Sequence, residues 1–428
     1  MLAHKETSPV RLLHIVGESR FGGVAGIILG LGRVAQADGW QVDVLTTDPV
    51  VQQAVRQAGL GLVDLDVIRR EIRPVWDLGG LVRLSRFLRR QPYQVVHTHT
   101  SKGGFVGRLA ARLAGVPVIV HTAHGFAFHE ASPAHVRKVY SALEHLASRW
   151  CDRIVSVSEF HRAWAIELGI CHPRQIVAIP NGIADVVRKR EAGLADLRRE
   201  LGARHGDLVI LSMSRLASDK GQEYLIEAAA MLPQTGRRFQ VVIAGEGPER
   251  ERLERLAHDR GVTQRVRFLG FRQDVGDLLA ASDMVVLPSL REGLSIALLE
   301  AMAAGKPIIA TSIGSQREVA AHADLARLVP PADARALSEA IVRLAGDEAL
   351  MARLGLTARA VYESCYTDTR MLHAYRQLYL DLLSAKFPVE VSAAVQGNSW
   401  RRAEPPQQAR QSHSDLVPTS REPKRGAL

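Results

Sequence analysis

Short apolar runs alternate with longer amphipathic stretches over most of the chain. The runs are rich in β-branched residues and are mostly bounded by Gly, Pro, Asn or Asp, which is typical of buried strands in parallel sheets. In the first half they occupy Val10–Val16, Gln41–Thr46, Val95–Thr98, Val118–His121, Arg153–Val157 and Ile176–Ile179. In the second half they occupy Leu208–Ser212, Phe239–Ala244, Val266–Leu269, Met284–Leu287 and Ile308–Ala310. Two such sets predict an α/β protein with two doubly wound, Rossmann-like domains.

The predicted domain boundary follows Asn181 and Gly182. The stretch 184–190 has no apolar period, and strand-like sequence resumes only at Leu208. We therefore expect an N-terminal domain over 1–185, a C-terminal domain over 186–367, a helix over 368–385 that can return to the N-terminal domain, and a disordered tail over 386–428. The tail is expected to be disordered because it is rich in Gln, Ser, Pro and Arg and has almost no apolar period.

Length and composition are those of an ordinary globular protein. The chain has 428 residues, of which 46% are hydrophobic and 23% charged, and this length favours two or three domains. Three cysteines are too few for a disulfide framework and suit a reducing cytoplasm. No signal peptide is visible, and no apolar run approaches the roughly 20 residues that span a bilayer. We expect a cytoplasmic protein that can lie on the inner face of a membrane without crossing it.

Positive charge is concentrated in the N-terminal half. Residues 1–200 carry +8 (26 Lys and Arg against 18 Asp and Glu), whereas residues 201–390 carry −1 (23 against 24). In the helical stretch Leu78–Arg90, four arginines accompany an apolar side. This pattern fits either a core helix with a basic outer face or a surface that settles on anionic lipid. A nucleic-acid partner is not expected, because aromatic residues make up only 5% and no recognition motif accompanies the charge.

Three glycine-containing turns follow predicted strands and precede predicted helices. The first contains Gly22 and Gly23, which let the backbone approach a ligand beside a helix N-terminus. The second carries Arg215 and Lys220, which together fit a cationic clamp on a diphosphate. The third is the segment Gly245–Gly247. Taken singly, each can also be a plain turn or a solvated loop, and the first is not a GxGxxG dinucleotide fingerprint.

The segment from Glu292 to Glu300 gives the strongest signal. Glu292 ends a predicted strand, and Glu300 lies eight positions later on the next helix. This spacing brings both carboxylates toward one ligand, where they can accept hydrogen bonds from sugar or ribose hydroxyls. Backbone amides between them, at the start of the helix, can bind phosphate. The alternative is a surface helix with unrelated glutamates.

Several histidines lie at predicted strand ends. His121 and His124 are three residues apart, but no further ligand motif supports a metal site there, and a structural role is the plainer interpretation. His97 and His99 end another strand and are expected to line an acceptor pocket. The pair of aspartates at 64 and 66 is interpreted as the end of a strand. We therefore predict no metal and no cofactor.

Together these motifs resemble glycosyltransferase family 4 in order and spacing. The resemblance rests on Ser214-Arg215-Leu216 with Lys220-Gly221, Ala244-Gly245-Glu246-Gly247-Pro248, Phe268-Leu269-Gly270-Phe271 with Asp274, and Glu292-Gly293 through Glu300-Ala301-Met302. It covers nearly all of residues 10–385. It implies the GT-B fold, a sugar-nucleotide donor and retention of configuration at the anomeric carbon.

The resemblance also implies roles for individual residues. Arg215 and Lys220 would hold the donor diphosphate, and Glu300 the ribose hydroxyls. The remaining donor contacts would come from Gly22, Gly23, Gly245, Glu246, Phe271, Arg272, Glu292, Gly293, Leu294 and Ser295. Many family members carry proline where this chain has Ser295. His124 would lie near the reacting sugar and form the catalytic set with Glu292, Arg215 and Lys220.

The resemblance favours attack by the acceptor hydroxyl on the face that the leaving group departs from, with the departing phosphate as base and without a metal. We expect UDP as the carrier, a polyprenyl-diphosphate-linked saccharide as acceptor, and a role in bacterial surface-polysaccharide synthesis. Three alternatives stay open: a sugar-nucleotide 2-epimerase of the same fold, a nicotinamide-dependent dehydrogenase, and a non-catalytic basic binding protein.

Overall fold

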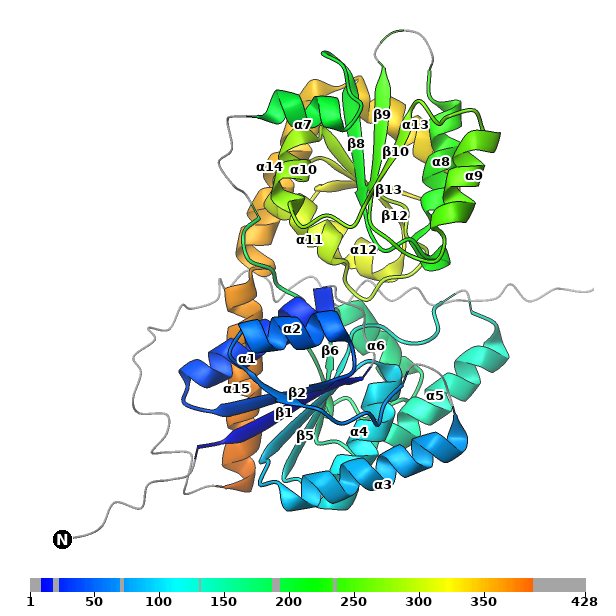
Figure 1. The fold of residues 1–428 in the computed structure, drawn as a ribbon. Coiled ribbons are helices and arrows are strands. Elements are labelled where there is room, and N and C mark those ends of the chain that lie inside the picture. The colour runs from blue at the N-terminus through cyan, green and yellow to red at the C-terminus, as the bar shows by residue number, and fades with distance from the viewer. Residues whose placement is uncertain are drawn as a thin grey trace, which may run out of the picture.

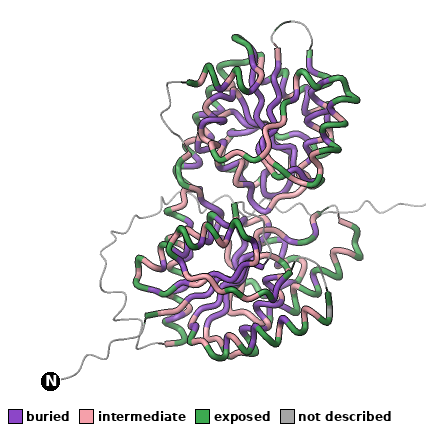
Figure 2. Tube along the Cα trace, in the orientation of Figure 1, coloured by how far each residue is buried: buried purple, intermediate pink, exposed green. Residues whose placement is uncertain are grey.

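The computed structural model describes residues 9–17, 23–69, 73–130, 132–186, 193–233, 236 and 238–387. They form two α/β units, one above the other in Figure 1. Strand pairing within both sheets is parallel. The central strands are buried along nearly their whole length, whereas the outer helix surfaces are exposed (Figure 2). Such burial on both faces explains why the strands are continuous apolar runs in the sequence.

The first sheet has seven strands in the order β3-β2-β1-β4-β5-β6-β7. They are β1 (Arg11–Gly17), β2 (Gln41–Thr46), β3 (Gly61–Val63), β4 (Val95–His99), β5 (Val118–Ala123), β6 (Arg153–Ser156) and β7 (Ile176–Ala178). The connecting helices are α1 (Gly23–Ala37), α2 (Pro49–Gln57), α3 (Pro74–Arg90), α4 (Ser101–Ala114), α5 (Ala134–Ser148) and α6 (Glu159–Glu167). One apolar core contains residues of α1 and another contains residues of α3 and α4.

The second sheet has six strands in the order β10-β9-β8-β11-β12-β13. They are β8 (Leu208–Met213), β9 (Phe239–Ala244), β10 (Val266–Gly270), β11 (Met284–Leu287), β12 (Ile308–Thr311) and β13 (Ala326–Val329). The helices are α7 (Leu194–Glu200), α8 (Gln222–Met231), α9 (Arg250–Asp259), α10 (Val275–Ala281), α11 (Ile296–Ala303), α12 (Gly314–Ala320), α13 (Ala334–Ala345) and α14 (Glu348–Cys365), with a short 3₁₀ turn η1 (Ser218–Lys220).

Two strands at sheet edges, β3 and β13, are absent from the strands predicted above. Only three residues form β3, none of them fully buried, and β13 carries the partly exposed Arg327 and Leu328. Edge strands need not be continuous apolar runs, because one side of the strand is free of the sheet. Asp64 directly follows β3, as interpreted from the sequence, whereas Asp66 lies in the loop beyond it.

The chain passes between the two units twice, at neighbouring positions. Ile183 and Thr367 form a parallel bridge, and the amide of Asp368 donates to the carbonyl of Ile183 at 2.9 Å. After this bridge α15 (Asp368–Lys386) runs beside α1 and adds Tyr375 and Tyr379 to the core of the first unit (Figure 1). Beyond residue 387, the predicted tail lies outside the described residues.

Candidate active site

Loops at the carboxyl ends of strands from both sheets line one cleft of about 960 Å³. Thirteen residues predicted for the site lie in its lining: Gly23, His124, Arg215, Lys220, Gly245, Glu246, Phe271, Arg272, Glu292, Gly293, Leu294, Ser295 and Glu300. Gly22 lies outside the described residues. The two units therefore contribute facing walls, as expected when parallel sheets meet at the ends where their ligand loops emerge.

Lys220 and Glu292 form the charged centre of one wall. Lys220 Nζ lies 2.8 Å from Glu292 Oε1, which also accepts a hydrogen bond from Ser289 Oγ at 2.9 Å. The turn that carries Lys220 requires a glycine next, because Gly221 has φ +65° and a Cβ there would lie 2.1 Å from the carbonyl oxygen of Pro288. This close approach sets the β8 loop against the β11 loop.

Arg215 is less firmly held than Lys220. Its guanidinium Nη2 lies 3.5 Å from Asp219 Oδ1, and its side chain is 39% exposed. Such an exposed pair contributes little to stability. The guanidinium can therefore turn toward an anion in the cleft at small cost.

The helix α11 begins at the cleft and carries Glu300. Ser295 is its N-cap, with Oγ accepting from the amide of Leu298 at 3.3 Å. The N-terminus of α11 faces the cleft through Gly293, Leu294 and Ser295, and helix N-termini favour anions. Burial raises the pKa of the Glu300 carboxyl to about 7, because desolvation disfavours its charged form.

The loops after β9 and β10 form the outer part of the cleft. A Cβ at Gly245 would lie 1.9 Å from the carbonyl oxygen of Ser214, so this turn needs glycine. Phe271 is largely exposed, which leaves one ring available to a flat ligand group. Arg272 is paired with Asp274 at 2.5 Å and Glu200 at 2.6 Å, and these hydrogen bonds raise its pKa.

The opposite wall comes from the first unit and includes His124. A Cβ at Gly293 would lie 1.9 Å from the carbonyl oxygen of His124, so the two units touch at this point. Asn181, which we did not predict as a site residue, also lines the cleft and donates to the carbonyl of Leu294 at 3.2 Å. Burial lowers the pKa of His124 to about 4, so this imidazole is neutral at physiological pH.

His97 and His99 do not line the cleft, which corrects the prediction for both. Both are fully buried, and His97 lies on the face of β4 that Tyr379 of α15 covers. His97 is hydrogen bonded to Thr122 Oγ1 at 2.8 Å and to Tyr379 OH at 2.5 Å. His99 is hydrogen bonded instead to two other imidazoles, His14 at 3.0 Å and His124 at 3.1 Å.

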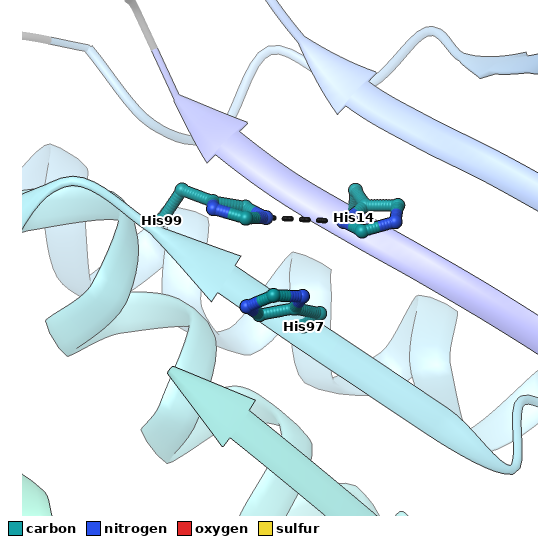
Figure 3. A group of neighbouring side chains, drawn as sticks. All are labelled: His14, His97 and His99. Atoms are coloured by element: carbon teal, nitrogen blue, oxygen red, sulfur yellow. Dashed lines mark hydrogen bonds between the residues drawn. The ribbon is translucent and has the colours of Figure 1, made fainter. Parts of the chain in front are cut away.

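His14 is the second residue that sequence reasoning missed. It stands opposite His97 in the register of β1 and β4, and its imidazole lies beside His99 (Figure 3). Ring nitrogens of His14, His97 and His99 lie within 4.8 Å of one another, a spacing that can in principle hold a metal ion. His121 instead bonds Thr98 Oγ1 at 3.0 Å.

The chain matches family models over both halves. Residues 195–361 match the model described as glycosyl transferases group 1, and residues 22–182 match the glycosyl transferase 4-like domain. UDP-Gal:alpha-D-GlcNAc-diphosphoundecaprenol alpha-1,3-galactosyltransferase of Escherichia coli is 32% identical over 322 residues, 74% of this chain and 83% of that protein. EpsD of Bacillus subtilis, named as a glycosyltransferase, is 31% identical over 325 residues, 74% of this chain and 84% of that protein.

Solved structures share the fold. HepE of Anabaena, in complex with UDP and glucose, has a TM-score of 0.76 at 22% identity and covers 87% of this chain and 100% of its own. WaaG, a glycosyltransferase involved in lipopolysaccharide biosynthesis, has a TM-score of 0.67 at 20% identity and covers 91% of this chain and 100% of its own. The prediction of two Rossmann-like domains in the GT-B arrangement is thus confirmed.

Proposed function

The chain belongs to the group 1 glycosyltransferases, and from that premise we propose that it moves a hexose from a UDP-sugar to a hydroxyl of a polyprenyl-diphosphate-linked saccharide. The observation that carries the proposal is the convergence of Arg215, Lys220, Glu300 and the start of α11 on one cleft, opposite His124. The E. coli relative is named for UDP-galactose and a diphosphoundecaprenol acceptor, which supports the choice of donor and acceptor.

The donor would bind along the wall built by the second unit. Arg215, Lys220 and the amides at the start of α11 surround the place for the diphosphate, and Glu300 accepts hydrogen bonds from the ribose hydroxyls. Phe271 offers its exposed ring to the base. Charge that grows on the departing phosphate would meet Lys220 and the α11 amides already in place, and preorganised donors of this kind usually make the largest single contribution to catalysis. We propose that they make a metal ion unnecessary.

The sugar would lie between Glu292 and His124. Because the pKa of His124 is lowered to about 4, its neutral ring can orient a sugar oxygen but is poorly suited to act as a proton acceptor at neutral pH. Glu292 is held by Lys220 and Ser289, so it is a positioned acceptor rather than a free nucleophile. We propose transfer with retention, in which the acceptor hydroxyl attacks beside the leaving phosphate and gives it the proton.

A lipid-linked acceptor requires approach to a membrane. None of the helices in the described residues is long and apolar enough to cross a bilayer. Leu84 and Leu88 of α3 are buried in the core, but Leu78 and Val82 are exposed beside its arginines. A core helix with a basic outer face, one of the two interpretations from the sequence, therefore explains the buried side of α3 but not its exposed apolar residues.

A second apolar surface lies on α5, beyond the intervening α4 (Figure 1). Val139, Leu143 and Leu146 are exposed at helical spacing, next to Lys138 and Arg149. Exposed apolar side chains with cationic neighbours suit the headgroup region of an anionic membrane. We propose that α3 and α5 dock the protein on the inner face of the cell membrane. Co-sedimentation with phosphatidylglycerol vesicles should weaken in Leu143→Asp and at high salt, and equal binding to neutral vesicles would contradict the proposal.

The first experiment is a thermal-shift screen against UDP-, GDP-, ADP- and CMP-sugars and NAD, with and without EDTA. A selective rise with a UDP-sugar that persists in EDTA and is lost in Glu300→Ala supports the donor site. Incubation with GlcNAc-diphosphoundecaprenol should then give an α-linked product by NMR. Conversion of the sugar nucleotide without acceptor would instead identify an epimerase, and a response to NAD alone would overturn the proposal.

A further inference from the structure

The N-terminus of α6, in the first unit, is capped by a side chain of the second unit. Ser158 is the N-cap of this helix, and its Oγ accepts from the amide of His161 at 3.2 Å. The amides of Glu159 and Phe160 instead donate to the two carboxylate oxygens of Glu318, at 2.9 and 2.7 Å. Glu318 belongs to α12, which packs against α6 between the two units (Figure 1). The cap of α6 is therefore completed by the other unit.

The charge of Glu318 strengthens this contact. Its carboxylate lies at the end of α6 where the helix dipole is positive, and hydrogen bonds to a charged acceptor are stronger than those between neutral groups. A neighbouring ion pair, Arg317 with Glu130, also joins the two units, at 3.2 Å. The side chains of that pair are 48% and 46% exposed, so it contributes little to stability. Of these two contacts, the one made by Glu318 is therefore expected to hold the units together.

Tight packing surrounds the Glu318 contact. Phe160 lies against Gly314, at the start of α12, where a Cβ would be 2.2 Å from the aromatic ring. Val157, which precedes the N-cap of α6, is fully buried and belongs to a core cluster of the second unit. A Cβ at Gly293 would lie 3.2 Å from the side chain of Val157. The start of α6 is therefore packed against the second unit as far as the loop between β11 and α11.

The helix α12 also holds that loop, residues 288–295, which we call the Glu292 loop. Ser315 Oγ, which is buried, donates to the carbonyl of Glu292 at 3.2 Å. Ser315 and Glu318 are three residues apart and so lie on neighbouring positions of one helix face. The Glu292 loop supplies Gly293, Leu294 and Ser295 to the lining of the cleft. One helix therefore connects the contact between the units with the wall at which we place the diphosphate.

We propose that Glu318 is a positioning residue for the transfer reaction. By capping α6 it keeps the two units closed, and through α12 it keeps the Glu292 loop against the first unit. This inference rests on the proposed function in taking the ligand of the cleft to be a UDP-sugar. Glu318 does not line the cleft, so it acts on the balance between closed and open forms. A ligand that needs both walls binds only as tightly as the closed fraction allows.

The contact made by Glu318 and the binding of the donor are linked. A donor that touches both walls favours the closed form, so a saturating donor offsets the loss of the Glu318 carboxylate. Removing this carboxylate should therefore raise the Kd for UDP and the donor KM while kcat stays close to its native value. A residue that acted in the chemical step would instead lower kcat.

The test compares variants of the full-length protein by small-angle X-ray scattering and by calorimetry with UDP. In Glu318→Ala we expect a larger radius of gyration without UDP and a return to the native radius at saturating UDP. Its Kd for UDP should rise about tenfold, the lower end of what a hydrogen bond to a charged group contributes. Glu318→Gln keeps one acceptor oxygen and should raise the Kd only a few-fold; it carries the same test if the alanine variant does not fold.

Two further variants serve as controls. Arg317→Ala removes the neighbouring ion pair between the units and should match the native protein in radius and in Kd. Ser315→Ala leaves the Glu318 carboxylate in place but frees the Glu292 carbonyl. It should keep the native radius and still raise the Kd for UDP, and an unchanged Kd would refute the connection through α12.

Three results would overturn the role of Glu318: an unchanged radius and Kd in Glu318→Ala, an equal change in Arg317→Ala, or a lower kcat at an unchanged donor KM. The radius measured without ligand separates this inference from the proposed function. An expanded Glu318→Ala, in a protein whose native form binds no UDP, refutes the donor site alone. Native UDP binding by an unexpanded Glu318→Ala refutes the role of Glu318 alone.

Discussion

Replacing Glu300 by Gln is expected to stabilise the protein at alkaline pH and to weaken donor binding. The pKa of this carboxyl is raised from 4.5 to about 7 by burial. The favourable contribution of the neutral carboxyl to the free energy of unfolding is therefore fully present below pH 4.5. It is lost as the pH rises through 7, because the folded protein then has to hold a buried charge. Gln has nearly the same shape as the protonated carboxyl but cannot ionise, so the variant keeps that contribution at every pH.

The size of the effect follows from the two pKa values. The free energy of unfolding of Glu300→Gln should exceed that of the native protein by under about 1 kcal/mol at pH 5 and by about 3 kcal/mol at pH 8. For a domain of this size that corresponds to a melting temperature higher by roughly 6–12 °C at pH 8. Thermal unfolding by circular dichroism at both pH values measures it.

The matched control is Glu251→Gln. The side chain of Glu251 is 86% exposed on α9, so its replacement should leave the melting temperature unchanged at both pH values. Equal stabilisation of Glu300→Gln at pH 5 and pH 8 would refute the reasoning, because it would show that the gain does not come from ionisation. Retained stabilisation by a UDP-sugar in Glu300→Ala, which has no acceptor at this position, would instead refute the assignment of Glu300 to the donor.

Three further predictions concern the cleft and the contacts between its two units. Lys220→Ala should abolish the thermal shift with a UDP-sugar, because it removes the diphosphate cation and leaves Glu292 without its 2.8 Å partner; an unchanged shift would exclude that role. Gly293→Ala should reduce transfer at least tenfold, since its Cβ would clash with the His124 carbonyl at 1.9 Å; scattering should show a more open molecule. Glu318→Gln should raise the donor KM a few-fold, because its carboxylate accepts from two amides at the start of α6, at 2.7 and 2.9 Å; an unchanged KM would show that this contact does not help to close the cleft.

The parts of the site that depend on local sequence were predictable. At Gly221 and Gly245, backbone oxygens would lie 2.1 and 1.9 Å from a Cβ atom. Only glycine fits these two turns, so the glycines in the sequence indicate where they lie. The spacing of Glu292 and Glu300 similarly follows from a short loop that ends at the N-cap Ser295 and about one and a half turns of α11. The resemblance to a glycosyltransferase family, which rested on these turns, is confirmed by the family models and relatives.

The parts that depend on strand register were not predictable. His14 reads as a polar interruption of an apolar strand, and only the pairing of β1 with β4 sets it among other histidines. His97 and His99 alternate with Thr98, as residues of a strand do. This alternation does not predict that α15 covers the His97 face of β4 with Tyr379. A helix 282 positions away in the sequence decides that His97 is buried rather than exposed to the cleft.

The position of α15 also has a consequence for how the protein is made. The core of the first unit is completed by Tyr375, Tyr379 and Leu383, which are among the last described residues of the chain. At typical ribosomal rates, about 10–40 s separate the synthesis of residue 183 from that of residue 387. Through that interval the core of the first unit lacks these three side chains and His97 lacks its tyrosine partner, while the second unit is synthesised. The unit that is synthesised first is therefore the one whose core is completed last, and a chain that ends before α15 lacks part of the core of its earlier half.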